Sequence, residues 1–119
     1  MKKVLVVDDS PTERFAMTEV LKKHGYQILT AENGTDGINK VKTEHPDLVI
    51  MDVIMPEKNG YQATRDLKRD ESAKNIPVII CTSKSQETDK IWGLRQGADK
   101  YLIKPVNEQE LLAAIKALE

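Results

Sequence analysis

The sequence predicts an α/β fold, a doubly wound parallel sheet built from five β-then-α units. Short, nearly continuous apolar runs alternate with longer amphipathic stretches along the 119 residues, which is typical of parallel strands joined by crossover helices. Turn and capping residues separate most of these segments. A chain of this length forms one hydrophobic core without disulfides or metals, so we expect a single domain over residues 1–119.

Five strands and five helices follow from this pattern. The apolar runs, rich in Val, Ile and Leu, predict strands at residues 3–7, 26–31, 47–51, 76–80 and 99–103. The amphipathic stretches predict helices at residues 11–23, 35–44, 60–69, 86–96 and 108–118.

The first helix has a clear start. Ser10 and Glu13 match a capping box and Pro11 occupies the first helical position, so the helix begins directly after the acids that end strand one. Its apolar stripe, which is expected to face the core, consists of Phe15, Val20 and Leu21, with Met17 nearby.

Similar signals bound the later helices. Gly25 and Gly97 stand where a helix must stop and the chain must turn back. Asn59 is expected to cap the third helix, and Asn107 with Glu110 is expected to cap the last helix as a capping box.

The fourth helix carries the only tryptophan, Trp92. Ile91, Leu94 and Ala98 fit the core stripe of this helix better, which turns Trp92 toward the flank. Trp92 is therefore either a partly packed aromatic or an anchor for a partner protein.

Composition and charge exclude several functions. The formal net charge is -1, so no basic field favours nucleic acid. The single cysteine, Cys81, excludes an internal disulfide, and its apolar neighbours predict a buried thiol. No apolar stretch approaches the length of a membrane span and no signal peptide is recognisable, so we expect a cytoplasmic protein that binds neither membranes nor nucleic acid.

Three carboxylates follow apolar runs that predict strands. Asp52 ends the run at residues 48–51, and Asp8 with Asp9 ends the run at residues 4–7. The carboxyl ends of parallel strands meet at one edge of the sheet, where ligands bind in open α/β folds. Carboxylates packed together repel one another, and a hard divalent cation such as Mg²⁺ relieves this repulsion.

This arrangement indicates phosphoryl transfer. Asp52 is a natural nucleophile that forms an acyl phosphate, and Mg²⁺ beside it neutralises charge on the phosphoryl oxygens. Thr82 and Lys104 follow two further apolar runs, so their hydroxyl and ammonium groups are expected at the same edge to bind the transferred group. Each residue alone is more often a turn, cap or solvated side chain, but together they indicate a site.

The same residues are the signature of the receiver domain of two-component response regulators, which the chain resembles from its first strand to its last helix. The shared motifs are Val-Val-Asp8-Asp9-Ser, Met-Asp52-Val-Ile-Met-Pro56, Asn59-Gly60, Cys-Thr82-Ser and Ile-Lys104-Pro105. The resemblance implies the flavodoxin-like, CheY-like fold with strand order 2-1-3-4-5. It also implies that Asp52 takes a phosphoryl group from the phosphohistidine of a partner histidine kinase.

The resemblance further implies roles for the acids. Asp9 and Asp52 would ligate Mg²⁺ directly, together with the backbone carbonyl of Ile54. Asp8 would act mainly through a metal-bound water.

It also implies a switch. Thr82 and Lys104 would hold the phosphoryl oxygens, and Tyr101 falls at the position of the family's switch aromatic. On activation Thr82 moves toward the phosphoryl group and the aromatic ring turns inward, which reshapes an output face that includes Trp92 and Lys90. The alternative is that Tyr101 is an inert strand residue.

Within the family, the chain resembles the stand-alone, PilH-type regulators of the chemotaxis-like twitching-motility system. The supporting stretches are Asp-Ser-Pro-Thr-Glu13, Ala31-Glu-Asn-Gly34, Tyr61-Gln-Ala-Thr-Arg65, Gln86-Glu-Thr-Asp-Lys90, Trp92-Gly93 and Arg95-Gln-Gly-Ala98.

We therefore expect a signalling phosphoprotein rather than an enzyme with an external substrate. The chain ends just after its last predicted helix and leaves no room for an output domain. The signal must then pass to a separate output protein, or the chain must drain phosphate from a shared kinase. A monomer is expected; the identity of the partners and dimerisation on phosphorylation are left open.

Two alternative functions require residues that differ from those in this chain. A Mg²⁺-dependent aspartyl-phosphate phosphatase would carry a second acid two residues after the nucleophile, where this chain has Ile54. A flavodoxin-like cofactor binder would need a glycine- and hydroxyl-rich loop after strand one, where this chain has two acids.

A further hypothesis concerns the lifetime of the phosphoryl group. Ile54 and Lys84 lie two residues after Asp52 and Thr82, close to the path of a hydrolytic water. Neither side chain offers the acid or carboxamide that would orient this water, which favours slow autodephosphorylation.

Overall fold

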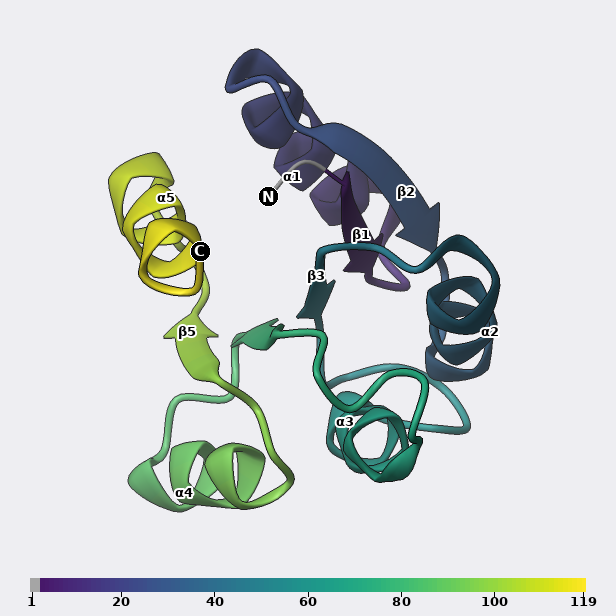
Figure 1. The fold of residues 1–119 in the computed structure, drawn as a ribbon. Coiled ribbons are helices and arrows are strands. Elements are labelled where there is room, and N and C mark those ends of the chain that lie inside the picture. Colours follow the sequence, from purple (N-terminus) through teal and green to yellow (C-terminus); the bar gives the residue numbers. More distant parts are fainter. Residues whose placement is uncertain (1–2) are drawn as a thin grey trace.

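Five parallel strands form the centre of the molecule, in the order β2-β1-β3-β4-β5 (Figure 1). The structure, a computed structural model, describes residues 3–119. The strands are β1 (Lys3–Val7), β2 (Gln27–Ala31), β3 (Leu48–Met51), β4 (Val78–Thr82) and β5 (Lys100–Ile103). The helices are α1 (Pro11–Lys23), α2 (Gly34–Glu44), α3 (Gly60–Arg69), α4 (Glu87–Arg95) and α5 (Glu108–Ala117). The predicted fold class and strand order are confirmed.

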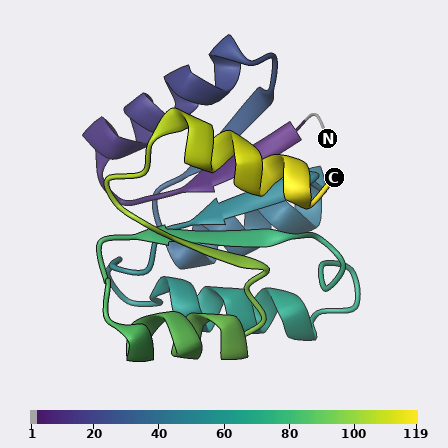
Figure 2. The ribbon, with the colours of Figure 1, turned by 90° about the vertical axis from the view of Figure 1, so that its left-hand side faces the viewer.

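Helices cover both faces of the sheet. Helices α1 and α5 lie on one face, and α2, α3 and α4 lie on the other (Figures 1 and 2). Successive strand residues point to opposite faces, so Val4 and Val6 pack with Leu21 of α1, whereas Leu5 and Val7 pack on the side of α2 and α3. Both faces of the strands are therefore apolar, which explains their continuous apolar runs.

The strand register places the site residues at one edge. Val7 pairs with Ala31 and Met51, so the residues that follow β1 and β3 emerge side by side. The backbone N–H of Asp52 donates to the Val7 carbonyl at 2.9 Å. At the end of the β4–β5 pair, the N–H of Lys104 donates to the Thr82 carbonyl at 2.8 Å, which brings these two residues to the same edge.

Strand β4 corrects one predicted boundary. The apolar pattern predicted a strand at residues 76–80, but β4 is Val78–Thr82. Pro77 has no N–H to donate, and the ladder with β3 begins at Val78, which pairs with Val49. At the other end Thr82 still pairs with Ile103, so Thr82 is the last residue of β4 rather than the residue after it. The other boundaries differ from the predictions by one residue at most.

The buried face of α1 is narrower than predicted. Leu21 is fully buried, and Met17 and Val20 pack against the same cluster. These three have the i, i+3, i+4 spacing that keeps side chains on one helix face. Phe15 is 66% exposed, because six positions from Leu21 amount to about 240° around the helix. The assignment of Phe15 to the core stripe was wrong.

Helix α4 also departs from its predicted stripe. Ala98, just after the helix, is buried as expected, but Ile91 and Leu94 are exposed, as is Trp92 at 46%. The residue that faces the sheet is Gly93, where a Cβ atom would lie 2.8 Å from the ring of Tyr101. The helix packs through its smallest residue, so its large apolar side chains point outward.

Most of the predicted end signals are confirmed. The side chains of Asn59 and Asn107 cap α3 and α5, and Gly25 and Gly97 have positive φ angles after α1 and α4. Cys81 is free and buried, as predicted. Within residues 3–119, none of the helices combines the length and the apolarity that crossing a membrane requires.

We predict that Leu21→Ala lowers the free energy of unfolding by about 2–5 kcal/mol, because it leaves a cavity under α1. Phe15→Ala should change it by at most about 0.5 kcal/mol, because the ring contacts solvent. Urea denaturation followed by circular dichroism measures both. Equal losses in the two variants would contradict the assigned face of α1.

Candidate functional site

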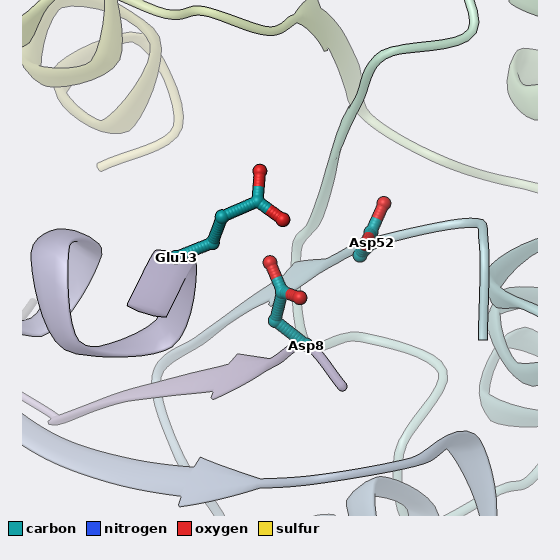
Figure 3. Close-up of side chains that lie close together, drawn as sticks. All are labelled: Asp8, Glu13 and Asp52. Carbon is teal, nitrogen blue, oxygen red and sulfur yellow. The ribbon is translucent and has the colours of Figure 1, made fainter. Parts of the chain in front are cut away.

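Three carboxylates from three elements meet at the carboxyl edge of the sheet. Asp8 follows β1, Asp52 follows β3, and Glu13 lies in the first turn of α1 (Figure 3). One carboxylate oxygen of each lies within 4.8 Å of the others. The predicted trio was Asp8, Asp9 and Asp52; Asp9 is exposed and does not belong to this group.

Asp52 is buried at the centre of the group. Its side chain accepts a hydrogen bond from the Val53 N–H at 2.8 Å, and the residue is only 7% exposed. The first residue of α3, Gly60, packs directly under it: a Cβ atom there would lie 2.0 Å from the Asp52 carbonyl oxygen. The Asn59-Gly60 motif therefore serves two purposes, since Asn59 caps α3 and Gly60 lets the helix approach the aspartate.

Lys104 supplies the positive charge of the site. Its Nζ atom lies 2.9 Å from Asp8, 3.1 Å from Glu13 and 3.5 Å from Asp52. The side chain extends from the end of β5 across the edge to the acid that follows β1. One ammonium group is thus shared by three carboxylates.

The pKa values reflect this crowding. Burial raises the pKa of Asp52 above its ordinary value, and Asp8 raises it further, although attraction to Lys104 opposes both effects. For Lys104, burial disfavours the charged form, but the hydrogen bond to Asp8 and the charge of Asp52 outweigh it and raise its pKa. The lysine therefore stays charged, and the ionised form of Asp52 is the costly one.

Asp8 is held by the start of α1. Its Oδ1 atom accepts the N–H of Ser10 at 2.9 Å, and Arg14 donates to its carbonyl oxygen at 2.7 Å. Because Asp8 takes the Ser10 N–H, only one half of the predicted capping box forms: Ser10 accepts from the Glu13 N–H. The Glu13 side chain contacts Lys104 instead. The box at Asn107 and Glu110 is likewise half formed.

Glu13 is the site residue that the sequence reasoning missed. The sequence assigned it to a helix cap and to a stretch shared with the PilH-type regulators, not to the site. The capping signal starts the helix directly after the acids that end β1, which indicates that its first turn lies near the edge, but this signal does not fix the direction of the Glu13 side chain.

Thr82 of β4 and Tyr101 of β5 are both hydrogen-bonded to the backbone of Lys84. The Thr82 hydroxyl accepts the N–H of Lys84 at 3.4 Å, and the carbonyl of the same lysine accepts the Tyr101 hydroxyl at 2.9 Å. The Tyr101 hydroxyl also lies 3.2 Å from that of Tyr61. Tyr101 is buried in this arrangement, and burial together with Tyr61 raises its pKa. Trp92 and Lys90, assigned to the same face, are exposed on α4.

The donor set of the site fits a hard divalent cation. Carboxylate oxygens converge from Asp8 and Asp52, and Ile54, whose carbonyl was assigned as a ligand, lies two residues beyond Asp52. Mg²⁺ prefers such oxygen ligands and retained waters. The negative charge of the group exceeds the single charge of Lys104, so a second cation would be bound favourably.

Comparison with known proteins identifies the relatives of this chain. Residues 4–116 match the family described as response regulator receiver domain. Protein PilH of Pseudomonas aeruginosa is 56% identical over 118 residues, which cover 99% of this chain and 98% of that protein. Protein PilG of the same organism is 42% identical over 115 residues, covering 97% and 85%. The solved chemotaxis protein CheY4 of Vibrio cholerae has a TM-score of 0.93 at 30% identity, covering 100% and 99%.

We predict that Asp52→Asn raises the melting temperature of the Mg²⁺-free protein near neutral pH by roughly 2–5 °C. The folded-state pKa of Asp52 is raised, so its contribution to stability is present below the unfolded pKa and lost as pH rises through the folded pKa. Asp52→Asn removes the buried negative charge and so restores this contribution to stability. The gain should shrink as pH falls through the raised pKa of Asp52, because the wild-type carboxyl then becomes protonated and neutral as well.

Asp9→Asn is the matched control, because it removes a charge from an exposed acid at the same edge. Its effect should be smaller. Calorimetry in the presence of a chelator measures both variants, and a melting temperature of Asp52→Asn at or below wild type would contradict the prediction.

Proposed function

The chain belongs to the response regulator receiver family, and on that basis we propose that Asp52 accepts a phosphoryl group from the phosphohistidine of a sensor histidine kinase. One observation carries the proposal: Asp52 is a buried carboxylate at the end of a central strand, and a charged lysine lies 3.5 Å from its oxygen. A buried acid with a raised pKa beside a fixed cation is typical of a reactive group rather than a surface acid.

The chemistry follows from these groups. A carboxylate oxygen of Asp52 attacks phosphorus, so a P–O bond forms while the P–N bond to the kinase imidazole breaks. The electron pair of that bond stays on the imidazole nitrogen, which takes up a proton. Lys104 turns from the carboxylates to the new phosphoryl oxygens, and the Thr82 hydroxyl donates to another of them.

Receiver domains bind Mg²⁺ at their acidic pocket, and the acids here fit that ion. In our proposal Asp9, Asp52 and the Ile54 carbonyl hold the ion directly, and Asp8 holds it through a water. When bound, the ion supplies positive charge that stabilises the phosphoryl oxygens during transfer. The position of Asp9 beside Asp8 in the chain supports its inclusion, although its side chain lies outside the trio.

The signal leaves through the face around α4 in this proposal. Movement of Thr82 toward the phosphoryl group would pull on Lys84, whose carbonyl holds Tyr101. Exposed apolar side chains of α4 and of the end of β5 offer contacts for an output protein; they are Ile91, Trp92, Leu94 and Ile103. Lys90 lies on the same helix. An exposed group of this kind favours the interpretation of Trp92 as a partner anchor.

The similarity to PilH and PilG supports a place in a chemotaxis-like system that drives twitching motility. In this proposal the chain is a cytoplasmic monomer that acts on an output protein or drains phosphate from a shared kinase. It turns over no external substrate. The phosphatase alternative is disfavoured, because Ile54, at the position of its second acid, is apolar and 56% exposed.

We predict that acetyl phosphate with Mg²⁺ adds one phosphate, about 80 Da, to the wild-type chain. Asp52 is the nucleophile, so Asp52→Asn should show no adduct. Intact-mass spectrometry measures both. Asp66→Asn, which changes an exposed acid on α3, is the control and should be modified like wild type. An equal adduct on Asp52→Asn would place the phosphoryl group elsewhere.

We also predict that Ile54→Asn shortens the lifetime of the phosphorylated form by about tenfold, equivalent to about 1.4 kcal/mol in the barrier. The exposed Ile54 side chain cannot orient a water beside Asp52, whereas a carboxamide can. The decay of the mass adduct after removal of the donor measures the lifetime. Ile91→Asn, an exposed isoleucine on α4, is the control. A wild-type adduct that decays within seconds would refute slow autodephosphorylation.

A further inference from the structure

We propose that Glu13 is a positioning residue that binds the ammonium of Lys104 and competes for it with the phosphorylated Asp52. The inference rests on the proposed function of Asp52 as phosphoacceptor. It gives Glu13 a role in setting how readily that site becomes phosphorylated.

The contact distances support this role. The Lys104 Nζ lies 3.1 Å from Glu13 but 3.5 Å from Asp52. Its contact with Asp8, at 2.9 Å, is the shortest of the three. In the unphosphorylated chain the ammonium is therefore bound more closely by Asp8 and Glu13 than by the phosphoacceptor.

The start of α1 directs the Glu13 side chain to this position. A glutamate at the third helical position usually turns back to the N-cap N–H. Here the Ser10 N–H is already taken by Asp8, so Glu13 is released from the cap and extends over the edge of the sheet. The neighbouring cation, Arg14, is bound by the Asp8 carbonyl and lies 3.5 Å from Glu32. Lys104 is the cation that Glu13 contacts.

Phosphorylation of Asp52 adds negative charge beside Lys104. An acyl phosphate carries more negative charge than the carboxylate it replaces, up to about -2. Lys104 is then drawn toward the phosphoryl oxygens, and Glu13 loses its partner and faces added negative charge within the group. Glu13 therefore favours the unphosphorylated state, because it competes with the phosphoryl group for the ammonium of Lys104.

The test uses beryllofluoride, a mimic of the phosphoryl group, at saturating Mg²⁺. Glu13→Gln keeps the length and the backbone N–H but removes the charge. We expect it to bind beryllofluoride about two- to fivefold more tightly than wild type, the range set by a half-exposed ion pair. Calorimetry measures the affinity. Glu110→Gln, at the same position of α5 and exposed, is the matched control and should bind like wild type.

A second pair of variants separates positioning from simple repulsion. In a Lys104→Met background, Glu13 has no ammonium to hold, so Glu13→Gln should change beryllofluoride affinity little. An undiminished gain in that background would show that Glu13 acts by its own charge and would overturn the proposal. So would equal affinities of Glu13→Gln, Glu110→Gln and wild type. If wild type bound no beryllofluoride and gained no phosphate, the proposed function itself would fail, and the inference with it.

Discussion

The structure depends on one electrostatic arrangement, the pairing of Lys104 with the acids at the carboxyl edge of the sheet. Asp8 and Asp52 are buried side by side because β1 and β3 are neighbours. Two buried carboxylates are costly unless a cation compensates them. The cation comes from the end of β5, two strands from β3 and three from β1, through the long side chain of lysine. The parallel order of the sheet is what allows residues far apart in the chain to share this charge.

The same edge is connected to α4 by two hydrogen bonds, of 3.4 and 2.9 Å, to the backbone of Lys84. Lys84 donates its N–H to Thr82 and accepts from Tyr101 with its carbonyl. Gly93 then lets α4 rest directly on the Tyr101 ring. A change at Thr82 can therefore reach the base of α4 without passing through solvent. The absence of a side chain at Gly93 lets the ring and the helix pack at close range.

Local signals predicted most of the elements, and the wrongly placed helix side chains have a common origin. Ser10, Pro11 and Asn59 act within one helical turn, so their effects could be read from the chain. The misplaced side chains, Phe15 and those of α4, depend on how a helix is rotated against the sheet. Periodicity gives the width of an apolar face, but the partner surface decides which part of it is buried.

The sequence by itself determined the order of the elements and the residues that end each strand, because apolar runs and their stops are local properties. Asp8, Asp52, Thr82 and Lys104 were placed at one edge on that basis, and the structure confirms their position at the strand ends. Only the tertiary structure decided which acid joined them. Glu13, rather than Asp9, joins them because α1 begins over this edge of the sheet. The direction of a side chain depends on packing that no local pattern encodes.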